Sequence, residues 1–208
     1  MSHDDFAVEP IPGLPERPPQ GEKILWQGRP NWWALAKSSC GVLWVAGYFA
    51  ALTLWRFFAV IDLMPLDLAI AASLPFAVLG AAACGLLMLF AYIQARCTVY
   101  TITTSRVAMR IGAALTITLN LPFTKIDSAD LDLRRDGTGT IAMTLQGPTR
   151  FGYLMCWPHV RPWRFNTQPA LRCINQVQHV SDLLSEAAQA RINEPRVARM
   201  QPAQVAAE

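Results

Sequence analysis

The pattern of apolar and polar positions divides the chain into three parts: a polar, proline-rich start, a long apolar middle, and an end in which short apolar and polar runs alternate. Residues 41–61 read GVLWVAGYFAALTLWRFFAVI, and residues 68–93 read LAIAASLPFAVLGAAACGLLMLFAYI. About 20 predominantly apolar residues suffice for a helix to cross a membrane. The pattern therefore predicts a transmembrane α-helical hairpin over residues 35–94. The alternative, two core helices of a soluble protein, is disfavoured because such helices rarely run this long without a polar stripe.

Basic residues predict how this hairpin is oriented. Lysines and arginines precede the first apolar stretch and follow the second, whereas the connecting DLMPLD contains none. Loops that carry Lys and Arg tend to remain cytoplasmic, so the chain is expected to be multi-pass with both termini cytoplasmic. Trp32, Trp33 and Tyr92 flank the stretches and are expected to be interfacial anchors, because indole and phenol rings favour the headgroup level.

Two features inside the apolar stretches concern possible contacts within the membrane. Arg56 either snorkels to the outer interface, where it would pair with Asp62 or Asp67, or contacts a partner protein. Small residues recur at four-residue spacing from Ala77 to Gly85, which permits close packing against another helix.

The start of the chain is unsuited to a long helix. Its first thirty residues contain six prolines in a polar setting. Residues 1–34 are therefore expected to be an extended or partly disordered cytoplasmic arm. This arm is either a partner-binding element or a plain tether.

The end of the chain predicts a cytoplasmic α+β domain over residues 95–192. Five short runs are rich in strand-forming residues, and several alternate with period two: TVYTIT, RVAMRI, LTITLNL, IDSADLDL and TIAMTLQ. A tight turn is expected at residues 103–106 and a hairpin turn at Asp136-Gly137, which gives an antiparallel meander. Behind Pro169, apolar residues at helical spacing from Ile174 onward predict an amphipathic helix that packs on the sheet. Residues 193–208 are expected to be a disordered tail.

Residues that carry catalysis or bind cofactors are sparse. The chain lacks HExxH, GxSxG, GxGxxG and phosphate-loop motifs, and its five cysteines are far apart. Neither apolar stretch holds a histidine, which disfavours a haem or chlorophyll ligated there. The net charge of +3 comes without a dense basic run, which argues against nucleic acid. We therefore expect a non-enzymatic protein without a metal or cofactor.

The most unusual segment is WPHVRPWRF at residues 157–165, where aromatic and basic side chains interleave. Its candidate contact residues are Trp157, His159, Arg161, Trp163, Arg164 and Phe165. Aromatic residues together with arginines are typical of protein interfaces and of surfaces that rest on anionic headgroups. The segment is predicted to be a docking loop. The alternative is a loop whose tryptophans close the bottom of the sheet.

Several segments carry a resemblance to a known family. IPGLPERPP and GEKILWQGRPNWWALA resemble the opening of the PuhB family of photosynthetic complex assembly proteins of purple phototrophic bacteria. YTITTSRV, LPFTKIDSADL and the final helix resemble the bacterial PH-like domain, an antiparallel β-barrel or sandwich capped by a C-terminal helix. The resemblance implies a non-enzymatic assembly factor for the reaction centre and its core light-harvesting complex, located in the bacterial inner (intracytoplasmic) membrane. Its implied partners are the reaction-centre subunits, either the H subunit or its complex, and the core antenna.

Two other classes of function are compatible with parts of the sequence. A membrane-anchored PH-like module would bind anionic lipid headgroups through Arg134, Arg135, Arg161 and Arg164. A membrane enzyme would need a converging polar cluster, which the sequence does not reveal. The sequence also leaves open whether the protein forms a homo-oligomer.

Overall fold

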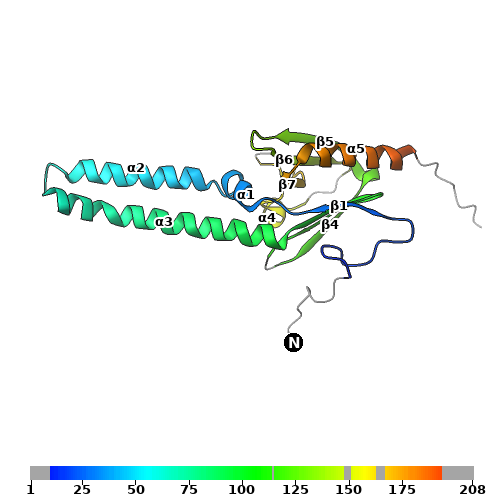
Figure 1. Ribbon diagram of the computed structural model, residues 1–208, viewed down its shortest axis with the longest axis horizontal. Coiled ribbons are helices and arrows are strands. Elements are labelled where there is room, and N and C mark those ends of the chain that lie inside the picture. Colours follow the sequence, from blue (N-terminus) through cyan, green and yellow to red (C-terminus); the bar gives the residue numbers. More distant parts are fainter. Residues whose placement is uncertain (1–9, 114, 148–150, 163–166, 194–208) are drawn as a thin grey trace, which may run out of the picture.

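The computed structural model describes residues 10–113, 115–147, 151–162 and 167–193. A long helical hairpin lies at one end and a β-rich domain at the other, with a short helix, α1 (Trp32–Ser38), between them (Figure 1). The hairpin consists of α2 (Val42–Val60) and α3 (Leu66–Cys97), which run side by side. Trp163, Arg164 and Phe165 of the predicted docking loop, and the predicted tail from residue 194 onward, lie outside the described residues.

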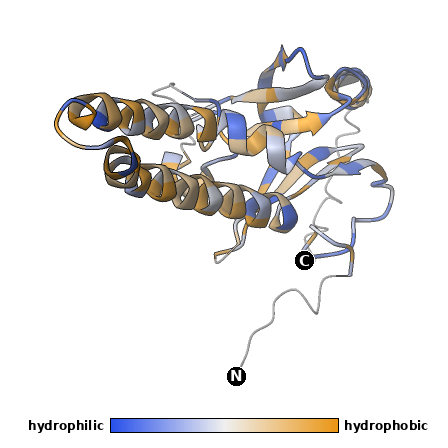
Figure 2. Ribbon diagram, turned by 60° about the vertical axis from the view of Figure 1, so that its left-hand side comes forward, coloured by the Kyte–Doolittle hydropathy of each residue, from blue (hydrophilic) through white to orange (hydrophobic). Residues whose placement is uncertain are grey.

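Both helices of the hairpin are long and apolar enough to cross a membrane. Only 6% of the residues in the most apolar part of α2 are buried, and 11% in that of α3. Figure 2 shows the predominantly hydrophobic colouring along both helices. The core helices of a soluble protein would instead be covered by the rest of the chain. The hairpin therefore leaves a large apolar surface uncovered in this chain.

The two helices pack closely against each other at a glycine. A Cβ atom added to Gly80 would lie 2.5 Å from the Cβ of Phe49, whereas one added to Gly85 would meet nothing within 4 Å. Ala77, Ala81 and Cys84 line the same apolar groove, opposite residues of α2. The predicted small-residue packing is thus found on the face that contains Gly80, and Gly85 does not take part in it.

Seven strands form two antiparallel sheets. The first has the order β1-β2-β3-β4, and the second has the order β5-β6-β7. The strands are β1 (Ile24–Gly28), β2 (Val99–Thr103), β3 (Arg106–Ile111), β4 (Ile117–Pro122), β5 (Ile126–Leu133), β6 (Thr138–Leu145) and β7 (Ala170–Asn175). Strands β2 to β6 coincide with the five runs predicted from the sequence. Two short helices connect strands: a 3-10 turn, η1 (Phe123–Lys125), and α4 (Tyr153–Cys156).

The predicted turns are also present. Between β2 and β3, the hydroxyl of Thr103 accepts a hydrogen bond from the backbone N–H of Arg106 at 3.1 Å. Between β5 and β6, Gly137 adopts a φ of 76°, and the side chain of Asp136 accepts from the backbone N–H of Thr138 at 3.1 Å. A side chain at residue 137 would be strained in this left-handed conformation, which explains the glycine.

The sheets enclose one hydrophobic core, to which α5 (Val177–Asn193) also contributes. Core side chains alternate along the strands, as Tyr100 and Ile102 do in β2. The described strands remain two separate sheets, so the fold is an open sandwich and not the closed barrel that was the other expectation. The buried face of α5 comprises Val177, Val180, Leu184 and Ala187.

The helix predicted behind Pro169 begins later than expected, so this part of the prediction is wrong. Residues from Ala170 to Asn175 form strand β7, and the helix begins only at Val177. The ALRC part of the strand is buried on both faces, so its pattern lacks the alternation that marks a half-exposed strand. Gln176 separates the two elements with a φ of 53°.

The predicted arm is partly integrated into the domain. Strand β1 pairs with the edge of β2, which satisfies backbone groups that an exposed edge would leave unpaired. The preceding turn lies against the same sheet: Leu14 is buried, and Gly13, with a φ of 87°, sits directly against Val99. The side chain of Gln27 then donates to the carbonyl of Pro12 at 2.7 Å. Residues 10–28 are therefore docked on the domain and are not a free extension.

Candidate functional site

The three predicted anchors converge where the hairpin meets the β-rich domain. The rings of Trp32 and Trp33 are 5.7 Å apart, and those of Trp32 and Tyr92 are 6.2 Å apart. Two cations join this aromatic cluster: Arg96 lies 5.3 Å from the centroid of the Tyr92 ring, and Lys37 lies 5.7 Å from that of Trp33. All three aromatic side chains are about two-fifths exposed. An exposed cluster of aromatic rings and cations is the composition expected at a membrane headgroup layer.

Helix α1 positions this cluster, and its start is set by Asn31. The Asn31 side-chain oxygen accepts from the backbone N–H groups of Trp33 and Ala34, at 3.0 and 3.1 Å. Its own backbone N–H donates to the carbonyl of Cys173 in β7 at 2.7 Å. Leu35 then packs with Ala34, Cys173 and an alanine of α3 in a small buried cluster. Helix α1 is thus attached both to α3 and to β7.

A network of buried hydrogen bonds surrounds His159 inside the domain. The Tyr100 hydroxyl lies 2.6 Å from Nδ1 of His159, and the Thr98 hydroxyl lies 3.0 Å from Nε2. The Tyr100 oxygen also accepts from the backbone N–H of Arg172 at 3.3 Å. Burial, assisted by the Arg172 cation, lowers the pKa of His159 to about 3. The imidazole is therefore neutral at physiological pH, and its two ring nitrogens are engaged by the hydroxyls of Tyr100 and Thr98.

His159 therefore differs from the expectation of a partner-facing residue. It is fully buried, and both of its ring nitrogens are engaged inside the domain. Trp157 is half-buried and stacks on Phe90 of α3, with ring centroids 5.6 Å apart. Arg161 lies at the surface, where it forms an ion pair with Asp130. The described part of the loop thus joins the domain to α3, and of its three candidate residues only Arg161 keeps a charged group at the surface.

The sequence reasoning named Arg134 as a candidate lipid contact but missed the cluster that it forms with Arg172 near the end of α1. Thr140 of β6 faces two residues of β7, Arg172 and Cys173, because the register shifts there. Such a bulge re-aims side chains. The Arg172 guanidinium donates to the Ser38 hydroxyl of α1 at 3.5 Å, and the Arg134 guanidinium donates to the Cys173 sulfur at 3.1 Å. Burial, with a contribution from the Arg134 cation, lowers the pKa of Arg172. No local pattern in the sequence marks this cluster, because its members come from four separate segments.

Arg56 is exposed on the side of α2. The part of the chain that the structure describes contains no ion pair between Arg56 and either Asp62 or Asp67. The expected pairing is therefore not seen. The guanidinium is left facing the surroundings of the hairpin.

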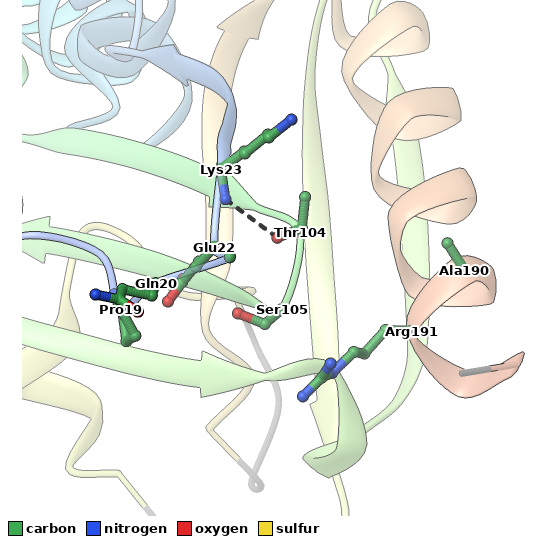
Figure 3. Close-up of a pocket in the computed structure, with 9 residues that line it drawn as sticks. Pro19, Gln20, Glu22, Lys23, Thr104, Ser105, Ala190 and Arg191 are labelled. Carbon is green, nitrogen blue, oxygen red and sulfur yellow. Dashed lines mark hydrogen bonds between the residues drawn. The ribbon is translucent and has the colours of Figure 1, made fainter. Parts of the chain in front are cut away.

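A polar pocket of about 680 Å³ lies where the arm, the β2–β3 turn and the end of α5 meet (Figure 3). The backbone N–H of Lys23 donates to the Thr104 hydroxyl at 3.2 Å. The Glu22 carboxylate, which is almost buried, pairs with Arg106 at 2.8 Å. Partial burial acts to raise the pKa of Glu22, but hydrogen bonds from Thr103 and Arg106 outweigh it and lower this pKa. These contacts at the pocket thus hold the arm against the sheet.

The chain was compared with known proteins. The family model of the bacterial PH domain matches residues 40–188. A protein of Rhodobacter capsulatus, described as an uncharacterized 23.7 kDa protein in the puhA 5' region, is 44% identical over 200 residues, which cover 95% of this chain and 94% of the relative. No solved structure is significantly similar. The family match spans more than half of the chain and confirms the expected PH-like domain. Together with its two antiparallel sheets, it establishes that this chain belongs to the bacterial PH domain family.

Proposed function

We propose that the protein is a non-enzymatic assembly factor for the bacterial photosynthetic reaction centre and its core light-harvesting complex. In this proposal the α2–α3 hairpin spans the inner membrane, and the PH-like domain lies at the cytoplasmic face with both termini. The N-terminal segments that resemble the PuhB family support the role, as does the relative whose name refers to the puhA 5' region. Neither the partner nor the activity is named by that relative.

The observation that carries the proposal is an exposed aromatic face on α2. Trp44, Tyr48, Trp55 and Phe58 are 86%, 61%, 71% and 66% exposed. At 3.6 residues per turn, these positions fall within a sector of about 80° around the helix axis. Large aromatic side chains supply much of the binding energy at protein interfaces. A membrane protein that packs against α2 would cover this face, whereas lipid alone does not require aromatic rings along one side.

Co-purification tests the role directly. A tagged chain would be isolated from detergent-solubilised photosynthetic membranes, and the eluate would be examined by mass spectrometry and absorption spectroscopy. Reaction-centre subunits should co-elute with the parent chain and be lost with Trp44→Leu/Trp55→Leu, which keeps the helix apolar. The matched control is Leu79→Ala/Leu86→Ala on the exposed surface of α3. An eluate that contains only this chain and lipid would overturn the assembly role.

Cysteine labelling tests the orientation. Leu63 lies in the connection between α2 and α3 and is 79% exposed, and Gln178 is exposed on α5. In intact spheroplasts, a membrane-impermeant maleimide should label Leu63→Cys above the level of the parent chain. Gln178→Cys should gain label only after lysis. The reverse pattern would contradict the proposed topology.

A further inference from the structure

The arginine cluster at the end of α1 borders a cavity of about 450 Å³. Its lining includes Ser38 from α1, Arg134 from the β5–β6 turn, Thr140 from β6, Arg161, and Arg172 from β7. A cavity of this size is in the range of small-molecule sites. Three of its side chains are guanidinium groups and two others are hydroxyls, all of which donate hydrogen bonds to anions.

Neither Arg172 nor Arg134 forms an ion pair with a carboxylate among the described residues. Besides the hydrogen bonds from Thr138, the charge of Arg134 does help to lower the pKa of Asp136, but that carboxylate pairs with Lys37 at 3.6 Å. Arg172 is only 4% exposed, yet its hydrogen bonds go to the carbonyls of Pro158 and Val160 and to a serine, and its Nε has no partner. Arg134 donates only to a cysteine sulfur and to the Thr140 hydroxyl. Buried charges in proteins are normally paired. An anion that enters the cavity would supply the missing counter-charge.

The acidic residues around the cavity do not supply this charge. Arg161 holds the carboxylate of Asp130 in an ion pair. Asp132 lines the cavity but is exposed and forms no ion pair with either cation in the described part of the chain. The lining contains three arginines and two aspartates, so it is positive overall. A phosphate group, with several acceptor oxygens, matches the forked donors of arginine.

The position of the cavity, beside the start of the hairpin, points to a source for such a phosphate. Ser38 is the last residue of α1, four positions before α2 begins, and Trp33 and Lys37 of the aromatic cluster lie on the same short helix. If α2 enters the bilayer at Val42, the cavity lies at the level of the headgroups. From the unpaired guanidinium groups and this position we propose that the cavity binds the phosphate of an anionic membrane phospholipid. The proposal requires membrane insertion but is independent of the assembly role.

A lipid titration of the full chain in a maltoside detergent and phosphate-free buffer tests this site. Short-chain phosphatidylglycerol should raise the melting temperature in a saturable manner, because a ligand that binds only the folded state stabilises it. Short-chain phosphatidylcholine and inorganic phosphate serve as the comparison ligands. Equal shifts with phosphatidylcholine would overturn the anionic site. An equal shift with inorganic phosphate at the same concentration would overturn the lipid as its source, in favour of a soluble anion.

Neighbouring arginines provide matched variants. Arg134→Gln should raise the concentration of phosphatidylglycerol at half-saturation by about tenfold or more, since a charge-assisted bond is lost. Arg135→Gln removes the same charge from an exposed residue outside the cavity lining and should leave the titration unchanged. Arg161→Gln, at the surface, is a second lining variant that should also weaken binding. Equal losses in Arg134→Gln and Arg135→Gln, or no shift in the parent chain, would overturn the proposal. Because no partner is present, failure here leaves the co-purification result untouched.

Discussion

Nδ1 of His159 and the hydroxyl of Tyr100 lie 2.6 Å apart in the core of the PH-like domain. The contact joins a residue that follows α4 to strand β2, which itself continues from α3. Burial raises the pKa of Tyr100, so its hydroxyl stays protonated and can donate to the imidazole. The pair thus links the strand that follows the apolar hairpin to the segment that follows α4.

This buried histidine should make the domain sensitive to mild acid. The pKa of His159 is about 3 in the folded chain and about 6.5 when solvated, so between these values the unfolded chain binds the extra proton. Stability should therefore fall as the pH drops below about 6.5, by up to about 1.4 kcal/mol per pH unit. His159→Gln, whose amide can accept from Tyr100 and donate to Thr98, should flatten the dependence. Melting temperatures in detergent between pH 7.5 and 5 measure it.

The control for this experiment is His179→Gln, which changes an exposed histidine on α5. Its melting temperature should follow that of the parent chain at each pH. Protonation of Glu22 should reduce the stability only at and below the usual pKa range of carboxyl groups, because the pKa of Glu22 is lowered. An unchanged slope in His159→Gln would show that another group causes the acid sensitivity.

The cap of α1 should determine how firmly the junction is held. Asn31→Ala removes the acceptor for two backbone N–H groups and should destabilise the helix by about 1 kcal/mol. Amide hydrogen exchange over residues 32–38 should accelerate by about fivefold, the factor that corresponds to this energy. Asn31→Asp keeps an acceptor and should restore protection. Asn120→Ala, on an exposed position of β4, is the surface control. Equal protection in Asn31→Ala and the parent would mean that packing alone holds α1.

Close helix packing should make Gly80 intolerant of a larger residue. Gly80→Ala places a Cβ 2.5 Å from the Cβ of Phe49, which forces the helices apart at a cost of about 1–3 kcal/mol. Gly85→Ala, on the same helix with nothing within 4 Å, should be neutral or slightly stabilising. Thermal unfolding followed by helical circular dichroism compares the two. Identical melting of both variants would mean that the hairpin relaxes without loss.

The Glu22–Arg106 ion pair should protect the arm from proteolysis. Glu22→Gln weakens a charge-assisted hydrogen bond at 2.8 Å and should speed tryptic cleavage after Lys23 by roughly tenfold. Glu186→Gln, an exposed position on α5, removes the same charge elsewhere. The rate of appearance of the shortened chain on gels measures the effect. Equal cleavage in the two variants would assign the docking of the arm to β1 and Leu14 alone.

The elements that sequence reasoning located correctly are those with a strong local signal. The two apolar stretches carry a single charge between them, Arg56, over the length of two helices. The runs that form β2 to β6 are rich in strand-forming residues and are separated by turn residues such as Gly137. Trp32, Trp33 and Tyr92 were singled out because aromatic rings beside an apolar stretch have a defined preferred depth, and their role as interfacial anchors stays a prediction. Their mutual contact follows from α1, which brings Trp32 to Tyr92.

The elements that were missed depend on contacts between distant segments. His159 appears polar in WPHVRPWRF, and its burial follows only from the hydroxyls of Thr98 and Tyr100, some sixty positions earlier. Strand β7 is buried on both faces, so its residues resemble the start of the helix that follows. The Arg134–Arg172 cluster requires a bulge in β7, which no local pattern announces.

Helix α3 has 32 residues and runs to Cys97, with Thr98 alone between it and β2. At about 1.5 Å per residue it is about 48 Å long, whereas a bilayer's hydrocarbon layer is about 30 Å thick. If the hairpin spans a membrane, the part of α3 that exceeds the hydrocarbon layer would set the distance between the PH-like domain and that layer. Because α1 contacts both α3 and β7, the PH-like domain would also be held at a fixed angle to the helix. A partner would thus contact the aromatic face of α2 and the PH-like domain in one fixed arrangement.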